Sequence, residues 1–160
     1  MKAHCGGFTL IELMIVVAIV AIIATIAIPN FLRMRLTSNE TAAVSNMRTL
    51  SSSEIAFQAS TLIDQDDDGV GDYGTLQELY QPPNGAPGWI DANLGAGNKQ
   101  GYFYVTNIVY GAINIVPAYS IVSMPIIENK TGIRRFFVDD SGVIRFNLDG
   151  PEPDVNSTPL

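Results

Sequence analysis

The sequence predicts an α+β protein in which a long N-terminal α-helix packs on a small C-terminal antiparallel β-sheet. Two observations support this fold class. Residues 13–28 carry no charged side chain and residues 30–59 contain neither glycine nor proline, so both segments favour helix. Residues 102–148 contain short runs of β-branched and aromatic side chains separated by turn-forming residues, which is typical of short strands.

Length and charge limit the classes of protein to consider. The chain has 160 residues and a formal net charge of −7, a size that suits one domain with an appendage. A protein that binds nucleic acid needs clustered lysine and arginine to neutralise phosphates, and the sequence has no such run. We therefore expect no nucleic-acid partner.

The sequence offers few residues for catalysis. The only cysteine and the only histidine are Cys5 and His4, and both precede Phe8. A chain that began at Phe8 would lack a cysteine nucleophile, a histidine base and a His/Cys zinc site. The neighbouring aspartates fall on one predicted turn, whereas acid/base pairs lie across a cleft. We expect a protein that is not an enzyme.

Residues 8–28 form an apolar segment long enough to cross a membrane. As a helix this segment spans roughly 30 Å, the thickness of the hydrocarbon core of a bilayer. A secretory signal peptide needs a small-residue cleavage site after its apolar core, and no good site precedes Pro29. A plain transmembrane anchor explains everything except Glu12, the only charge in the segment.

The presence of Glu12 in this segment requires an explanation, because placing a charged side chain inside a membrane costs free energy. No lysine or arginine occurs between Lys2 and Arg33. One interpretation places the carboxylate at the level of the lipid headgroups. In the other, cleavage before Phe8 creates an α-amine whose pKa of about 7.7–8.0 leaves it cationic at neutral pH. Glu12 then pairs with the Phe8 amine of a neighbouring chain.

Residues 7–14 read GFTLIELM. They closely resemble the type IV prepilin processing motif, a glycine followed by Phe-Thr-Leu-Ile-Glu at the head of an apolar run. The resemblance implies a leader peptide, residues 1–7, that a membrane prepilin peptidase removes by cutting between Gly7 and Phe8. It also implies N-methylation of Phe8 and an assembly role for Glu12. Glycine has no Cβ, which lets a peptidase approach the backbone closely.

The resemblance divides the rest of the chain into three parts. Residues 8–29 are the hydrophobic helix of the membrane and the filament core, and residues 30–59 are the amphipathic second half of that helix. Residues 60–160 are a globular head with an acidic loop and an antiparallel sheet. Pro29 would kink or end an isolated helix, but membrane helices tolerate proline within bundles, and in similar proteins the helix continues.

The second half of the helix carries an apolar stripe that can seat the head. Its members lie at i, i+4, i+7 and i+14, with two flanking residues: Ala43, Met47, Leu50 and Phe57, flanked by Val44 and Ile55. We interpret this stripe as core packing.

Residues 60–101 are rich in glycine, proline, asparagine and aspartate, which predicts a long surface loop. Part of this loop follows a calcium-loop pattern, which has carboxylates at its first, third, fifth and ninth positions and a glycine at its sixth. The carboxylates are those of Asp64, Asp66, Asp68 and Asp72, and the glycine is Gly69. Thr75 at the twelfth position departs from an EF-hand, which has a bidentate glutamate there. A calcium site and a solvated acidic turn both stay open. The resemblance to the type IV pilin and pseudopilin family bears on this choice, because the major pseudopilins of type II secretion carry a calcium site in the head.

Three stretches near the C-terminal end predict three or four antiparallel strands. They are residues 102–110, residues 113–127 with interruptions at Pro117 and Pro125, and residues 133–148. The sequence from Asp140 to Gly142 breaks the last stretch into a hairpin. We expect the sheet to pack on the outer half of the helix. Residues 151–160 contain three prolines and are predicted to be irregular.

Together these interpretations predict a structural subunit of a type IV pilus-like filament, a homopolymer assembled by machinery in the inner membrane. The subunit would lie in the inner membrane before assembly and in an extracellular pilus afterwards. Two alternatives stay open. One is the major pseudopilin of a type II secretion system, in a periplasmic pseudopilus. The other is a membrane-anchored extracytoplasmic binding module. Calcium is the only cofactor that the sequence suggests.

Overall fold

The computed structural model describes residues 7–112, 115–148 and 152–160. The chain forms two compact units, Met1–Arg35 and Leu36–Leu160, and helix α1 (Leu10–Ala59) contributes to both. Some predictions fall partly outside the described residues. These are the leader at residues 1–6, the predicted strand at residues 113–114 and the start of the tail at residue 151.

The first unit holds the N-terminal part of α1. Apolar side chains occur on every side of this part of the helix, and its membrane-length apolar window has no buried residue. By length and composition α1 can cross a membrane. Pro29 lies inside the helix, which continues on both sides of it. The prediction of helix before and after Pro29 is therefore confirmed.

In the second unit, residues 36–59 of α1 bury one side against the head. The four members of the predicted stripe are fully buried: Ala43, Met47, Leu50 and Phe57. Val44 is partly buried and packs against the same core. Ile55 is 54% exposed, so its assignment to the stripe is wrong. At about 100° per residue, Ile55 lies about 120° around the helix axis from Ala43.

The sheet has six antiparallel strands in the order of the chain, which confirms the α+β class. The strands are β1 (Asn98–Lys99), β2 (Tyr102–Val109), β3 (Ala118–Pro125), β4 (Arg135–Asp139), β5 (Arg145–Asn147) and β6 (Thr158–Pro159). Strands β2 to β5 lie where strands were predicted. The expected number of three or four is too low, because β1 and β6 have two residues each, too few to show an alternating pattern. Strand β6 also corrects the prediction of a wholly irregular tail.

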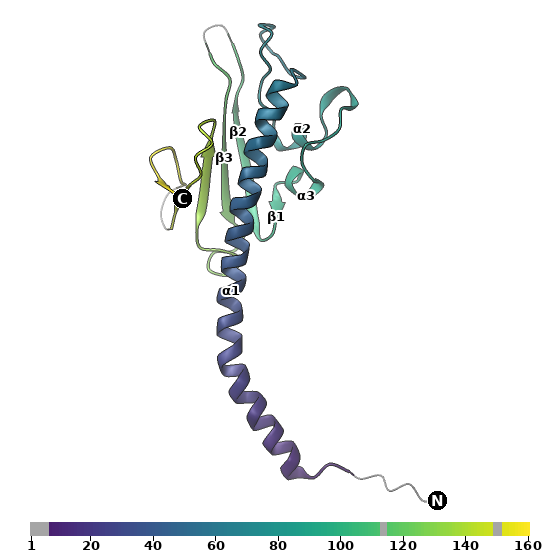
Figure 1. The fold of residues 1–160 in the computed structure, drawn as a ribbon, viewed down its shortest axis with the longest axis vertical. Helices are drawn as coiled ribbons and strands as arrows, with labels where there is room; N and C mark the ends of the chain where they lie inside the picture. The colour runs from purple at the N-terminus through teal and green to yellow at the C-terminus, as the bar shows by residue number, and fades with distance from the viewer. Residues whose placement is uncertain (1–6, 113–114, 149–151) are drawn as a thin grey trace, which may run out of the picture. The chain divides into compact units, whose positions relative to one another are not determined.

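One face of the sheet packs on α1, which crosses it in Figure 1. Alternate residues of the three central strands form the buried face: Tyr102, Tyr104, Tyr119, Ile121, Phe136 and Val138. Polar pairs link helix and sheet within this core. Asn46 Nδ2 donates to the Tyr104 hydroxyl (2.9 Å), and the Ser51 and Tyr119 hydroxyls are 2.8 Å apart. Each pair satisfies polar groups that would be costly to bury alone.

The predicted surface loop from residue 60 to residue 101 contains more structure than expected. It includes α2 (Leu76–Tyr80), the 3₁₀ turn η1 (Pro83–Gly85) and α3 (Ala92–Gly95). Leu79 and Leu94 from the two helices are buried in the core of the head. Helices of four or five residues are too short to show helical periodicity in a sequence rich in glycine and proline.

Candidate functional sites

The predicted cleavage position lies in backbone that precedes α1. Residues 7–9 are not helical, and α1 begins at Leu10. The Phe8 side chain is 84% exposed. A Cβ placed on Gly7 would have no heavy atom within 4 Å. The peptide bond between Gly7 and Phe8 is therefore accessible to another protein.

The Glu12 carboxylate has a partner within its own chain. Thr9 donates to Glu12 Oε2 from its backbone N–H (2.9 Å) and from its hydroxyl (2.7 Å). The Glu12 N–H in turn donates to Thr9 Oγ1 (3.3 Å). This reciprocal arrangement is a capping box, in which two side chains satisfy N–H groups that the first turn of a helix leaves unpaired.

The capping box answers part of the question that the sequence raised about Glu12. The segment contains no lysine or arginine, but neutral donors from Thr9 solvate one carboxylate oxygen. The sequence pattern Thr-x-x-Glu before an apolar run indicates such a box, and the sequence analysis missed it. Among the described residues, no hydrogen bond reaches Glu12 Oε1. Pairing of Glu12 with the Phe8 amine of a neighbouring chain stays a prediction.

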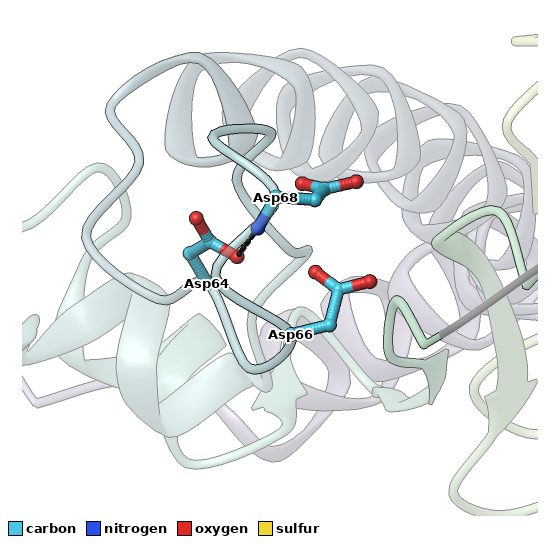
Figure 2. A group of neighbouring side chains, drawn as sticks. All are labelled: Asp64, Asp66 and Asp68. Carbon is cyan, nitrogen blue, oxygen red and sulfur yellow. Dashed lines mark hydrogen bonds between the residues drawn. The ribbon is translucent and has the colours of Figure 1, made fainter.

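Three aspartates of the acidic loop lie together, as Figure 2 shows. Oxygen atoms of Asp64, Asp66 and Asp68, one from each carboxylate, are within 4.8 Å of one another. Asp64 accepts from the N–H groups of Asp68 (3.3 Å) and Gly69 (3.0 Å), and Gly69 has a positive φ of 83°. The loop thus folds sharply around the carboxylates at the glycine. The pKa of Asp66 is raised, mainly by desolvation and to a smaller extent by the nearby charge of Asp68.

Asp72 is not a member of this cluster of three, although its Oδ1 and the Asp66 carboxylate both lie beside Gly111, and it has a different role. Its side chain is buried, and it accepts hydrogen bonds from the N–H groups of Gln65 and Gly111. These bonds fasten the acidic loop to the chain that follows β2. Asp72 is thus committed to protein donors, whereas the other three aspartates share one small volume. The structure does not test calcium binding, which stays a prediction.

A buried carboxylic acid in the head was not singled out from the sequence. Glu54 is fully buried on α1, and its Oε2 accepts from the Gly74 N–H (3.0 Å). Its Oε1 has no hydrogen-bond partner among the described residues. Desolvation raises the pKa of Glu54 to about 8; the Gly74 hydrogen bond acts in the opposite direction, and the charge of Glu78 adds to the rise. Its spacing from Met47, Leu50 and Phe57 would have placed it on the buried stripe.

Comparisons with known proteins agree with the N-terminal geometry. A family model described as the prokaryotic N-terminal methylation motif matches residues 2–28. The N-terminal segment is similar to that of type IV pilins. The chain is 51% identical over 51 residues to the type IV major pilin protein PilA of Myxococcus xanthus. It is 55% identical over 38 residues to the type IV wide pilus major component PilA4 of Thermus thermophilus.

The similarity to these pilins covers only part of each protein. The matched regions are 32% and 24% of this chain, and 23% and 29% of the two relatives. No solved structure matches the chain. The comparisons therefore concern the pilin-type N-terminal segment, and the α+β head is described by its own structure.

Proposed function

We propose that this protein is a structural subunit of a type IV pilus-like filament. The observation that carries the proposal is the exposed apolar part of α1 directly after a pilin-type processing motif. Exposed apolar surface of this extent needs a bilayer or other apolar helices around it. The two relatives are named as pilus components, and the proposed role is likewise structural rather than catalytic.

The proposed sequence of events begins in the inner membrane, where residues 8–29 hold the uncleaved chain. Prepilin peptidase cuts between Gly7 and Phe8, and Phe8 is N-methylated. The assembly machinery of the inner membrane then moves the subunit into the homopolymer, where contacts between helices replace contacts with lipid. The filament forms an extracellular pilus.

Glu12 is the proposed assembly carboxylate. In the filament core it neutralises the Phe8 amine of a neighbouring subunit, because either charge alone would be heavily penalised there. The capping box occupies Glu12 Oε2 and orients the carboxylate at the first turn of α1. Apolar packing supplies cohesion between helices, and the ion pair sets their register.

The acidic loop supports one alternative, a major pseudopilin of a type II secretion system. Three clustered carboxylates that fold around a glycine are a suitable ligand set for calcium, which prefers oxygen ligands. Calcium titration of the full chain in detergent, followed by calorimetry, tests this prediction. Asp66→Asn together with Asp68→Asn should abolish the heat of binding, and Asp154→Asn in the tail should leave it unchanged. Absence of any heat in the unaltered chain would establish a solvated acidic turn.

The mass of the N-terminus tests the proposed function. The protein is isolated from its own cells, and sheared surface material is analysed separately from the membranes. A chain that begins at Phe8 in sheared fibres supports the pilus subunit. The same chain found only in the membrane fraction favours the pseudopilin. An intact Met1 in cells with a working peptidase contradicts the proposal and leaves a membrane-anchored head.

A further inference from the structure

Asn84 and Gly85 form the only asparagine–glycine pair in the chain, within the proline-rich sequence QPPNGAPG. Both residues are exposed at η1. Asn84 has φ 60° and ψ 16°, Gly85 has φ 71°, and the Ala86 N–H donates to the Pro83 carbonyl (3.4 Å). These values describe a type I′ turn, whose two central residues need positive φ and are commonly Asn-Gly.

The side-chain amide of Asn84 is accessible and uncommitted. Within the described part of the chain, no hydrogen bond involves this amide. A Cβ added at Gly85 would have no heavy atom within 4 Å, so space is open around the Gly85 nitrogen. By contrast, the side-chain amide of Asn39 donates to the Thr131 carbonyl (2.8 Å), and Asn46 is buried.

We propose that Asn84 is a site of spontaneous deamidation in the folded protein. The Gly85 backbone nitrogen attacks Asn84 Cγ, so that an N–Cγ bond forms, the Cγ–Nδ2 bond breaks and ammonia leaves with the proton of the Gly85 N–H. A five-membered succinimide results. Water then opens the ring at either carbonyl and gives aspartate or isoaspartate. The net reaction converts an amide and water into a carboxylic acid and ammonia, with no oxidant or reductant.

The glycine after Asn84 is what makes the attack feasible. A following residue without Cβ leaves the backbone nitrogen unshielded and the local backbone free to rotate. The aspartate product keeps a dipeptide, Asp-Gly, that also suits a type I′ turn. The isoaspartate product places an additional backbone atom in the turn and does not suit it. Each product adds one negative charge to a head that is already acidic.

A second pair of this kind shows how the fold can protect such a sequence. Asp68-Gly69 has the same potential for ring closure, but the Gly69 N–H donates to Asp64 Oδ2 (3.0 Å). Asp68 Oδ1 is also occupied, because it accepts from the Val70 N–H (2.7 Å). Both reacting groups are therefore committed to other partners. The structure thus predicts reaction at Asn84 and protection at Asp68.

Incubation of the full chain in detergent, in warm and mildly alkaline buffer, tests the proposal. Digestion and mass spectrometry should show the peptide with Asn84 gaining the mass of an amide-to-acid conversion, in two products, aspartate and isoaspartate. Asn84→Gln should abolish the conversion, because glutamine would have to form a larger ring. Asn129→Gln is the matched control, since Asn129 is also exposed at positive φ (59°) but precedes lysine. It should leave conversion at Asn84 unchanged.

Two results would overturn the proposal. One is an unmodified Asn84 peptide in the folded chain while the same chain in urea converts, which would show that the turn protects the site. The other is conversion at Asn129 as fast as at Asn84, which would show that exposure alone decides. Neither result depends on whether the protein forms filaments, so the proposed function is tested separately.

Discussion

The two halves of α1 contain similar apolar residue types but present them to different surroundings. Before Arg35 the apolar side chains lie on every side of the helix and are exposed. After Leu36 they form one stripe that is buried under the sheet. A helix that is apolar all round needs an apolar environment outside its own chain, whereas a helix with one stripe needs only its own head. The apolar surface of the first half therefore has no cover within a single chain, whereas the apolar stripe of the second half is covered by the head of its own chain.

The carboxylates of the two halves differ in the same way. Glu12 lies at the exposed start of α1, bonded to neutral donors of its own first turn. Glu54 is fully buried in the head, with one oxygen paired to a backbone N–H. In our proposal Glu12 pairs with a neighbouring chain, whereas Glu54 is buried within its own chain. Substitution of Glu12 should therefore change filament yield, and substitution of Glu54 should change the free energy of unfolding of the head.

Glu12→Ala should have the largest effect, on assembly rather than on the head. Removal of one partner from a buried ion pair costs about 3–5 kcal/mol, because the remaining charge is left unpaired in the filament core. We expect normal membrane insertion and normal stability of the head, with little sheared filament on quantitative immunoblots. Glu152→Ala, in the exposed tail, is the matched control. A normal filament yield from Glu12→Ala would remove the ion-pairing argument.

Glu54→Gln should change how stability depends on pH. Since the pKa of Glu54 is raised from 4.5 to about 8, the folded head holds this proton more tightly than the unfolded chain. Its contribution to stability is complete below the unfolded pKa near 4.5 and is lost as the pH rises through about 8. The loss is on the order of 5 kcal/mol when ionisation is complete.

Urea unfolding of the full chain in detergent measures this dependence at several pH values. Glutamine cannot ionise and keeps an oxygen for the Gly74 N–H, so the variant should be the more stable protein above about pH 8 and lose that advantage in mild acid. Glu152→Gln serves as the exposed control. Parallel pH profiles of variant and unaltered chain would show that Glu54 does not titrate in this range.

Leu50→Ala should destabilise the head by about 3 kcal/mol, through lost burial and the cavity that remains. Ile19→Ala, in the exposed first half of the same helix, should change the unfolding free energy of the head by less than about 0.5 kcal/mol. Fluorescence of Trp89, whose ring lies 5.3 Å from that of Phe57, can follow unfolding. Equal effects of the two substitutions would contradict the division of α1 into two environments.

Thr9→Val should have the smallest effect. Loss of a helix cap costs about 1 kcal/mol. The variant should lower helicity at the start of α1 and reduce filament yield less than Glu12→Ala does. Thr9→Ser, which keeps the hydroxyl, should restore both. A yield from Thr9→Val as low as that of Glu12→Ala would mean that the cap, rather than the charge, controls assembly.

Elements with a regular pattern could be predicted from the sequence. The stripe on α1 followed from helical spacing, and the central strands followed from runs of apolar and aromatic residues between turns. The short helices and two-residue strands could not be predicted, because their formation depends on packing and pairing partners far along the chain. Strand β6, for example, exists by pairing Pro159 with Arg145 and Thr158 with Phe146.

Some features of the candidate sites could be predicted from local spacing, and others depended on residues far along the chain or on residue types that are seldom buried. The neighbouring positions of Asp64, Asp66 and Asp68 on one turn followed from their alternate spacing. The commitment of Asp72 to the N–H of Gly111, a residue 39 positions away, could not be predicted from that spacing. Glu54 was overlooked because charged residues are almost never fully buried without a partner. Its helical spacing placed it on the buried stripe, and only its residue type argued against burial.

The position of the capping box relative to the cleavage bond has a consequence for the order of events. Thr9 and Glu12 both follow the bond between Gly7 and Phe8, so removal of the leader leaves every bond of the box in place. The first turn is the costly step in forming a helix. In the proposed sequence of events, a subunit therefore has no helix to nucleate again after the peptidase has acted. Proteolysis and extraction can follow each other without a refolding step between them.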